Sequence, residues 1–130
     1  MNFDKLYDIA KSVVNPKQLS YFAKSGSVGA AILTASGNVY TGVSIETECG
    51  MGFCAEHSAA AAMITNGESH IVKFIAVGKI GNIMPPCGRC REFLRQLHSD
   101  NFNAQVKIDD NTVTTLKDLL PYDWKKSSQI

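Results

Sequence analysis

The chain has no surplus of positive charge, no long apolar run and no dense set of cysteines. Its 13 basic and 12 acidic residues leave a net charge of +1, whereas polynucleotide-binding proteins usually present a basic stripe to the phosphates. The small apolar residues from Ala59 to Ile64 form a run far shorter than the ~20 residues of a membrane span. These absences argue against a nucleic-acid chain or a lipid bilayer as the main partner.

The N-terminus also lacks the apolar segment of an export signal between Met1 and Lys5. We therefore expect a cytoplasmic protein. In that compartment thiols stay reduced, and clustered cysteines bind metal or catalyse more often than they form disulfides. The four cysteines of the chain are accordingly candidates for such a role.

The length of 130 residues and the mass of 14.1 kDa correspond to one compact domain over residues 1–130. A hydrophobic fraction of 45% and a charged fraction of 19% are typical of a soluble globular protein. No linker, internal repeat or low-complexity tract divides the sequence.

Hydrophobic periodicity and turn residues predict an alternation of helices and strands. The expected helices span residues 3–14, 55–66, 87–98 and 116–120, and the expected strands span residues 28–34, 39–45, 71–78, 105–108 and 112–115. This order predicts a three-layer α/β/α sandwich, an α/β fold in which helices cover both faces of a mixed β-sheet.

Three cysteines lie at the starts of predicted helices: Cys54 opens one helix, and Cys87 and Cys90 lie in the first turn of another. The partial positive charge of a helix N-terminus favours the thiolate over the thiol. Residues 87 and 90 share one helix face, and Cys54 would complete a three-thiolate set if the two N-termini converge. Three protein ligands leave one tetrahedral position open, which is the pattern of a catalytic zinc site.

Glu56 lies in the same first turn as Cys54 and is a candidate proton relay beside such a metal. A redox pair or a structural zinc knuckle would also explain Cys87 and Cys90. Neither alternative requires Cys54 or Glu56 at its position. Cys49 lies outside the pattern, and we expect it to be an ordinary small side chain.

The segments Cys-Ala-Glu at residues 54–56 and Pro-Cys-Gly-Arg-Cys at residues 86–90 resemble the signature of zinc nucleoside deaminases. Residues 28–33, 42–46 and 119–121 extend the resemblance to the small, homotetrameric cytidine deaminase family. The resemblance implies a cytidine deaminase-like fold and one zinc ion per subunit, bound by the three cysteines. It also implies hydrolysis of cytidine and deoxycytidine to the uridines and ammonia, a reaction of pyrimidine salvage.

The resemblance further implies a role for each residue around the metal. Glu56 is expected to take a proton from the zinc-activated water, to protonate N3 of the pyrimidine, and then to protonate the departing amine. The backbone amide of Ala55 and the carbonyl of Pro85 correspond to positions that contact the base and the leaving amine in the family.

The substrate-binding positions depart from the family pattern. The family's ribose-binding asparagine and glutamate correspond to Ser44 and Glu46, so that only the glutamate is retained. Gly26 replaces an aromatic residue that packs on the pyrimidine in the family, and Tyr21 or Phe22 is a candidate substitute. The serine and the glycine resemble blasticidin S deaminase, which acts on a cytosine-bearing antibiotic. We favour cytidine or deoxycytidine, because a buried carboxylate aimed at a sugar hydroxyl discriminates strongly.

Two residues beside the ligands are further candidates. His57 lies three residues after Cys54 and is a rival ligand, but three thiolates already complete an open zinc site. The family usually has an arginine at position 57. We expect Arg89 to offset the negative charge of the zinc–thiolate set in its place, and the alternative is a solvated arginine.

The remaining features have simpler explanations. The alanines from Ala59 to Ala62 could pack against a second subunit or against the chain's own sheet. His70 and His98 have no partner at a regular spacing and are expected at the surface or at a helix end, and Lys125 and Lys126 are expected to form a solvated tail. Two other classes, a base-flipping nucleic-acid deaminase and a non-catalytic zinc module, share the metal ligands but are not favoured.

Overall fold

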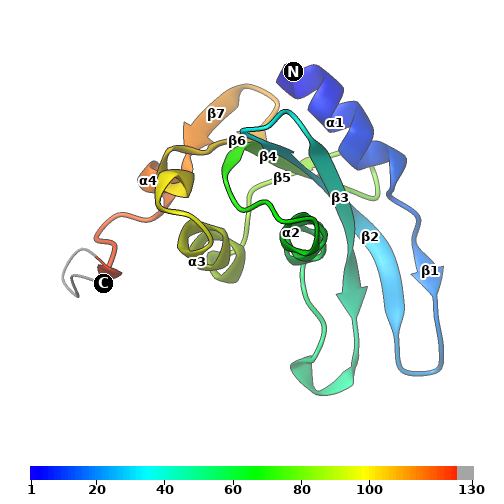
Figure 1. The fold of residues 1–130 in the computed structure, drawn as a ribbon. Coiled ribbons are helices and arrows are strands. Elements are labelled where there is room, and N and C mark those ends of the chain that lie inside the picture. Colours follow the sequence, from blue (N-terminus) through cyan, green and yellow to red (C-terminus); the bar gives the residue numbers. More distant parts are fainter. Residues whose placement is uncertain (126–130) are drawn as a thin grey trace.

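In the computed structural model of the protein, residues 1–125 are described (Figure 1). The helices are α1 (Phe3–Ser12), α2 (Ala55–Thr65), α3 (Gly88–Gln96) and α4 (Leu116–Leu119), with short 3-10 helices η1 (Glu48–Gly50) and η2 (Ser99–Asn103). The strands are β1 (Lys17–Gln18), β2 (Lys24–Thr34), β3 (Val39–Glu46), β4 (Ile71–Gly78), β5 (Ile83–Met84), β6 (Gln105–Asp109) and β7 (Thr112–Thr115).

One mixed sheet forms the centre of the molecule. Strand β2 pairs with β1, β3 and β4, strand β4 pairs with β5 and β6, and β6 pairs with β7. The β4–β6 pair is parallel, and the other pairs are antiparallel. A parallel pair requires a crossover connection, and the segment that contains α3 provides it.

Helices cover both faces of the sheet, as Figure 1 shows for α1 on one side and α2 with α3 on the other. Strand β2 is buried on both faces: Ala30 and Ile32 point into the cluster under α2 and α3, whereas Ala31 and Leu33 point into the cluster under α1. The predicted three-layer α/β/α sandwich is confirmed.

The structure contains elements that the sequence pattern did not predict. Strands β1 and β5 have two residues each, too few for any periodicity. They form because they pair with the long strands β2 and β4. Strand β2 also begins at Lys24, earlier than expected, and its register with β3 shifts between Ser25 and Gly29.

Helix α2 packs closely on β3 through small residues. Ala59 and Ala60 are fully buried, and a Cβ atom at Gly42 on β3 would overlap the backbone nitrogen of Ala59. These two alanines therefore pack on the chain's own sheet. The close approach fixes α2, whose first turn contains Glu56, against the strand that contains Ser44.

The segment after α2 is hydrogen-bonded to the β2–β3 hairpin through the carboxylate of Glu68. The hydroxyl of Tyr40 donates to Oε2 of Glu68 at 2.6 Å, and Nδ2 of Asn38 donates to the same oxygen at 2.8 Å. The bond from Tyr40, with that from Asn38, lowers the pKa of Glu68 to about 2. Ionised Glu68 is thus favoured by the folded protein.

The low pKa of Glu68 predicts that the protein loses stability in acid. The pKa of an unfolded glutamate is about 4.3, so the contribution is complete above that pH and disappears as the pH falls through the folded value of about 2. We expect the free energy of unfolding to fall less steeply over this window in Glu68→Gln and in Tyr40→Phe than in the wild type. Denaturant unfolding across the window measures the slope, and parallel curves would contradict the assignment.

The last described residues are bound to α3. Nε of Arg95 lies 3.2 Å from the buried carboxylate of Asp123, and Nζ of Lys125 lies 2.6 Å from both Asp123 and Glu92. The indole nitrogen of Trp124 also donates to Glu92, at 3.1 Å. The expectation of a solvated tail is therefore wrong for Lys125, because two carboxylates hold it. Lys126 lies outside the described residues.

Within residues 1–125, none of the helices has both the length and the apolar character needed to cross a bilayer.

Candidate metal centre and active site

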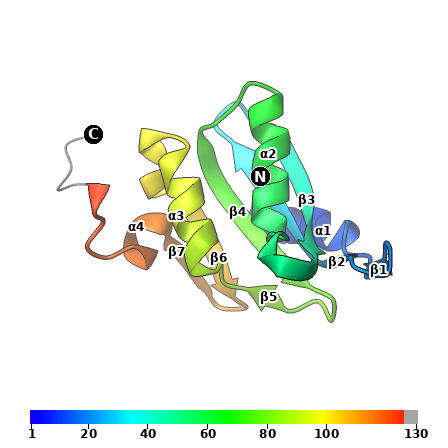
Figure 2. The same ribbon diagram turned by 90° about the horizontal axis from the view of Figure 1, so that it is seen from below.

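The three predicted ligands come together where α2 and α3 begin. Cys54 is the N-cap residue of α2, and Cys87 is the N-cap residue of α3. Figure 2 shows the two helices side by side on one face of the sheet, with their first turns at the same end, near β5. The Sγ atoms of Cys54, Cys87 and Cys90 all lie within 4.8 Å of one another, and those of Cys54 and Cys87 are 3.5 Å apart.

The chemistry of this sulfur cluster fits a soft divalent cation. Burial, followed by the charge of Glu56, raises the pKa of Cys90 far above its usual range, and burial also raises the pKa of Cys54. Burial opposes ionisation of Cys87 too, but hydrogen bonds, first that from the backbone N–H of Cys90, keep its pKa below the usual value. A divalent cation would remove the repulsion that keeps all three from ionising together. Three thiolates are a donor set suited to zinc.

Glu56 lies beside the cluster in the first turn of α2, with 4% of its surface exposed. Burial raises the pKa of its carboxyl group, and a backbone hydrogen bond offsets part of that increase. A carboxyl group that is shielded from bulk water and raised in pKa is suited to both accept and return a proton.

A pocket of about 110 Å³ opens onto Glu56 and two of the cysteines. Three of the predicted substrate-binding residues, Ser44, Ala55 and Pro85, line it. The pocket is also lined by Val28, Ala76 and Met84, which the sequence reasoning missed. Met84 could have been found from its position next to Pro85 in the sequence. No local feature of the sequence marks Val28 or Ala76 as a pocket residue.

Ser44 has a structural partner within this pocket. Its Oγ accepts a hydrogen bond of 3.0 Å from the backbone N–H of Val28, next to the irregular part of the β2–β3 pairing. The hydroxyl proton of Ser44 is still available as a donor. The side chain therefore links β3 to β2 at the wall of the pocket and keeps one donor free.

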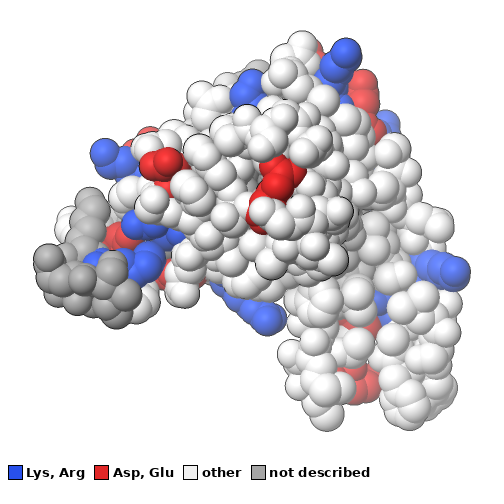
Figure 3. Space-filling view, viewed as in Figure 1, with Lys and Arg blue, Asp and Glu red and all other residues white. Residues whose placement is uncertain are grey.

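Glu46 lies outside this pocket, two residues further along β3. It lines a second, polar cavity of about 210 Å³ together with Tyr21, Phe22, Lys24 and others. Figure 3 shows acidic atoms at the lower right, where the segments around β1 and η1 project from the body. Since residues i and i+2 of a strand face the same side about 7 Å apart, Glu46 faces the same side as Ser44. Tyr21 and Phe22 line this second cavity, not the pocket beside the cysteines.

The structure explains the glycine at position 26. Gly26 has a φ of 84°, in the left-handed region that side chains disfavour. A Cβ atom there would also overlap the backbone carbonyl of Asn15, whose amide donates to the Gly26 carbonyl at 2.9 Å. An aromatic side chain cannot occupy position 26 on this backbone.

His57 lies outside the sulfur cluster and contacts one of its three cysteines. Its Nδ1 lies 3.3 Å from Sγ of Cys90, and its ring stacks on Phe93 with 4.1 Å between centroids. Burial, and then the charge of Arg89, lowers the pKa of His57. Nδ1 of His57 is thus within hydrogen-bonding distance of the sulfur of Cys90, and its role as an outer contact of the metal centre, not as a ligand, stays a prediction.

This contact predicts the behaviour of a His57→Ala variant. We expect it to retain one zinc per chain, because all three sulfurs remain, with an affinity about 10- to 100-fold weaker through the lost outer contact. Metal analysis after gel filtration and a competition titration with a chelator provide the measurements. A His57→Gln variant, which retains a donor, is the matched control. Complete loss of zinc from His57→Ala would show that the histidine is a ligand.

Arg89 is exposed and extends toward the loop before Cys54. Its Nη1 donates to the carbonyl of Gly52 at 3.5 Å. The guanidinium group is near enough to influence His57 electrostatically. Its effect on the charge of the metal centre stays a prediction.

Comparison with known proteins agrees with this site. The profile of the family described as "Cytidine and deoxycytidylate deaminase zinc-binding region" matches residues 4–105. A cytidine deaminase of Mycobacterium tuberculosis is 36% identical over 97 residues, which cover 73% of this chain and 70% of the relative. The crystal structure of cytidine deaminase from Mycobacterium leprae superimposes with a TM-score of 0.78 at 30% identity, covering 93% and 98% of the two chains. A blasticidin-S deaminase of Bacillus cereus is 29% identical over 110 residues, covering 77% and 78%.

Proposed function

Because the chain belongs to the cytidine and deoxycytidylate deaminase family, we propose that it is a zinc-dependent hydrolase that converts cytidine or deoxycytidine into the corresponding uridine and ammonia. One observation supports this most directly. A buried carboxyl group, that of Glu56, shares a pocket with Cys54 and Cys87. A structural zinc site requires no such carboxyl group and no open pocket.

In this proposal Cys54, Cys87 and Cys90 would hold the zinc ion, and the bound zinc would supply an activated water molecule as the nucleophile near neutral pH. Glu56 accepts a proton from the attacking water and delivers it to N3 of the pyrimidine. The same carboxyl group then takes the remaining proton of the hydroxyl added at C4 and transfers it to the exocyclic amine, which leaves as ammonia as the C4=O bond of the product forms. The backbone N–H of Ala55 and the carbonyl of Pro85 orient the base, and Arg89 offsets part of the negative charge of the thiolates.

The dimensions of the site are consistent with a nucleoside. The pocket of about 110 Å³ beside Glu56 accommodates a pyrimidine ring but not a whole nucleoside. Glu46 lies about 7 Å further along the same strand face and lines the neighbouring polar cavity. We infer that Ser44 donates to the ligand within the pocket and that Glu46 accepts a hydrogen bond from a sugar hydroxyl. Such a charged acceptor would reject analogues that lack the hydroxyl.

A second substrate, blasticidin S, is favoured by specific observations. A blasticidin-S deaminase is among the relatives, Ser44 replaces the amide expected of cytidine deaminases, and Gly26 excludes an aromatic platform at its position. The apolar walls supplied by Val28 and Met84 enclose a base without aromatic stacking. These features affect the binding of the base and of the sugar or its replacement, and they leave the reacting groups unchanged.

Comparing kcat/KM for cytidine, deoxycytidine and blasticidin S distinguishes the two substrates. The ultraviolet absorbance change on deamination reports each rate. We expect kcat/KM for cytidine or deoxycytidine to exceed that for blasticidin S at least tenfold, with the difference reduced in Glu46→Gln. The reverse order would assign the chain to the antibiotic. The absence of turnover on all three would contradict the proposed function.

We also infer that the protein is a cytoplasmic homotetramer that acts in pyrimidine salvage and does not bind nucleic acid. The net charge of +1 supports a small substrate. Tyr21, Met51 and Ile80 are exposed apolar side chains that contacts between subunits would cover. Light scattering gives the mass in solution, and a monomer at micromolar concentration would contradict the assembly.

A further inference from the structure

Two histidines that have no partner at a regular spacing in the sequence lie together in the structure. His70 precedes β4 and His98 is the N-cap residue of η2, and their rings stack with 4.5 Å between centroids and 3° between planes. One ligand atom from each ring and one carboxylate oxygen of Asp100 all lie within 4.8 Å of one another. We propose that His70, His98 and Asp100 form a second metal site, which binds a first-row divalent cation such as Zn²⁺ or Ni²⁺.

The donor set indicates this class of ligand. Two imidazoles and one carboxylate suit zinc, nickel and cobalt, whereas calcium and magnesium prefer sites made only of oxygen. Both histidines are half-buried and Asp100 is exposed, so water can complete the coordination. An open cavity of about 430 Å³, which His70 and Asp100 help to line, provides the space.

A buried amide holds the two histidine segments together before any metal binds. Asn101 is fully buried. Its Oδ1 accepts from the N–H of Ile71 at 2.7 Å, and its Nδ2 donates to the carbonyl of Ser69 at 3.0 Å and to that of Leu94 at 2.9 Å. These bonds flank His70 on both sides and anchor the segment that contains His98 and Asp100. A site whose backbone is fixed in this way needs little reorganisation to bind an ion.

The side chains need a small movement to close on the ion. Zinc–nitrogen bonds of about 2.0–2.1 Å require the donors to approach from their present spacing, and the parallel rings must tilt toward a common point. The terminal torsion of a histidine is broad, so such a tilt is accessible. Nδ1 of His98 now accepts from the backbone N–H of Asp100 at 3.0 Å. Binding at that nitrogen exchanges this exposed hydrogen bond for a metal bond.

The lysine that lines this cavity is held by other groups. Lys73 lines the same cavity, but its Nζ donates to the carbonyl of Met1 at 2.8 Å and lies 5.3 Å from the ring centre of Phe3. Because Lys73 is bound elsewhere, the negative charge of the Asp100 carboxylate remains available to a bound cation.

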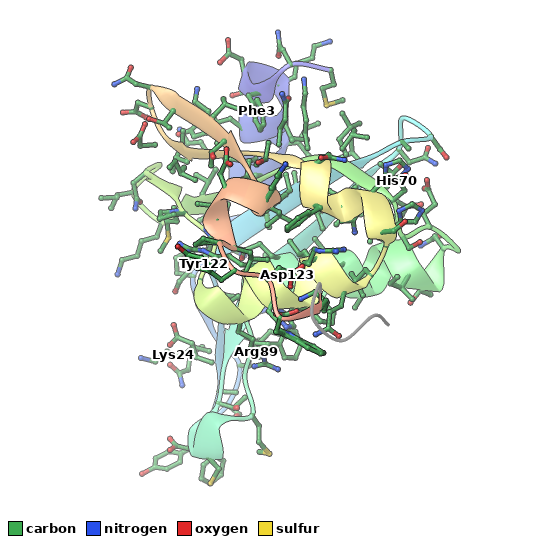
Figure 4. All side chains as sticks on the ribbon, turned by 90° about the vertical axis from the view of Figure 1, so that its left-hand side faces the viewer. Phe3, Lys24, His70, Arg89, Tyr122 and Asp123 are labelled. Atoms are coloured by element: carbon green, nitrogen blue, oxygen red, sulfur yellow. The ribbon has the colours of Figure 1, made fainter. Side chains whose placement is uncertain are left out.

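This site is separate from the deaminase centre. His70 precedes the first residue of β4, whereas Ala76, near the other end of that strand, lines the catalytic pocket. Six strand residues span about 20 Å. In Figure 4, His70 and Arg89, which lies in the first turn of α3, are labelled well apart. Binding at the second site is therefore not a step of the proposed reaction.

Titration of the zinc-loaded protein tests the proposal. Isothermal titration with Zn²⁺ or Ni²⁺ should reveal one further equivalent per chain, with a rise in Tm because the ion binds the folded state. We expect His70→Gln and His98→Asn to weaken this binding at least tenfold without changing deaminase activity or the first equivalent. Asparagine at position 98 retains a good N-cap for η2, which guards against a simple folding defect.

Two controls identify the ligands. Asp100→Asn should weaken binding, whereas Asp110→Asn, at the exposed turn between β6 and β7, should not. Co²⁺ in the second site should lack the sulfur charge-transfer absorption of a thiolate complex. The proposal is wrong if no second equivalent binds, if the equivalent persists in the His70→Gln/His98→Asn double variant, or if it disappears in Cys49→Ser.

Discussion

Replacing Glu56 by glutamine is expected to lower kcat/KM for cytidine by a factor of about 10²–10⁴, the usual contribution of a positioned general acid–base group. Glutamine has nearly the same size, so the pocket and the sulfur cluster should persist. It can neither take a proton from water nor return one to the amine. The variant should therefore retain one zinc per chain and the wild-type Tm while turnover is lost. Stopped assays at high enzyme concentration, with metal analysis of the same sample, provide the measurement.

A matched control comes from the other end of α2. Glu68→Gln removes a carboxylate whose partners are Tyr40 and Asn38, far from the cysteines, and should leave kcat/KM near the wild-type value. Unchanged turnover in Glu56→Gln would remove the proton relay from the mechanism. It would also revive the interpretation of the cluster as a non-catalytic zinc module.

The Cys90→Ser variant should lose both zinc and activity. Cys90 is fully buried and lies next to Cys87 and His57, so serine replaces a soft ligand at a position that water cannot easily fill. A catalytic metal contributes several kcal/mol of transition-state stabilisation, which corresponds to about 10³-fold or more in rate. Metal content after dialysis and kcat/KM for cytidine should fall together.

Cys49→Ser is the corresponding control, since the same substitution is made at an exposed cysteine outside the cluster. Zinc content and activity should match the wild type. If Cys90→Ser kept its zinc with unchanged affinity while Cys49→Ser lost it, the three-sulfur assignment would have to be abandoned.

The sequence predicted those parts of the fold that have local signals. The apolar run at residues 71–78 and the amphipathic pattern of residues 3–14 correspond to β4 and α1. By contrast, β5 has only two residues and exists because Ile83 and Met84 pair with β4. The bulged start of β2 likewise depends on its neighbours, including the bond between Val28 and Ser44. Such features are set by tertiary contacts that no short window of sequence contains.

The site could be anticipated only in part for the same reason. Spacing predicted that Cys87 and Cys90 share one helix face, and the family resemblance implied that Cys54 joins them. The three sulfurs do lie together. Spacing could not predict that Ser44 and Glu46 line different cavities, because this depends on how far the β1 and η1 segments project. Nor could it predict the stacking of His70 on His98, which requires the buried amide of Asn101 to join two distant segments.

The backbone at Gly26 limits how this protein could change its substrate over evolution. An aromatic residue at that position is not one mutation away, because a side chain there meets both an unfavourable φ and the carbonyl of Asn15. The N-terminal connection that contains Asn15 would have to be rebuilt first. Val28 and Met84 already line the pocket beside Glu56 without that constraint. Selection for a different base or sugar would therefore act first on those two side chains.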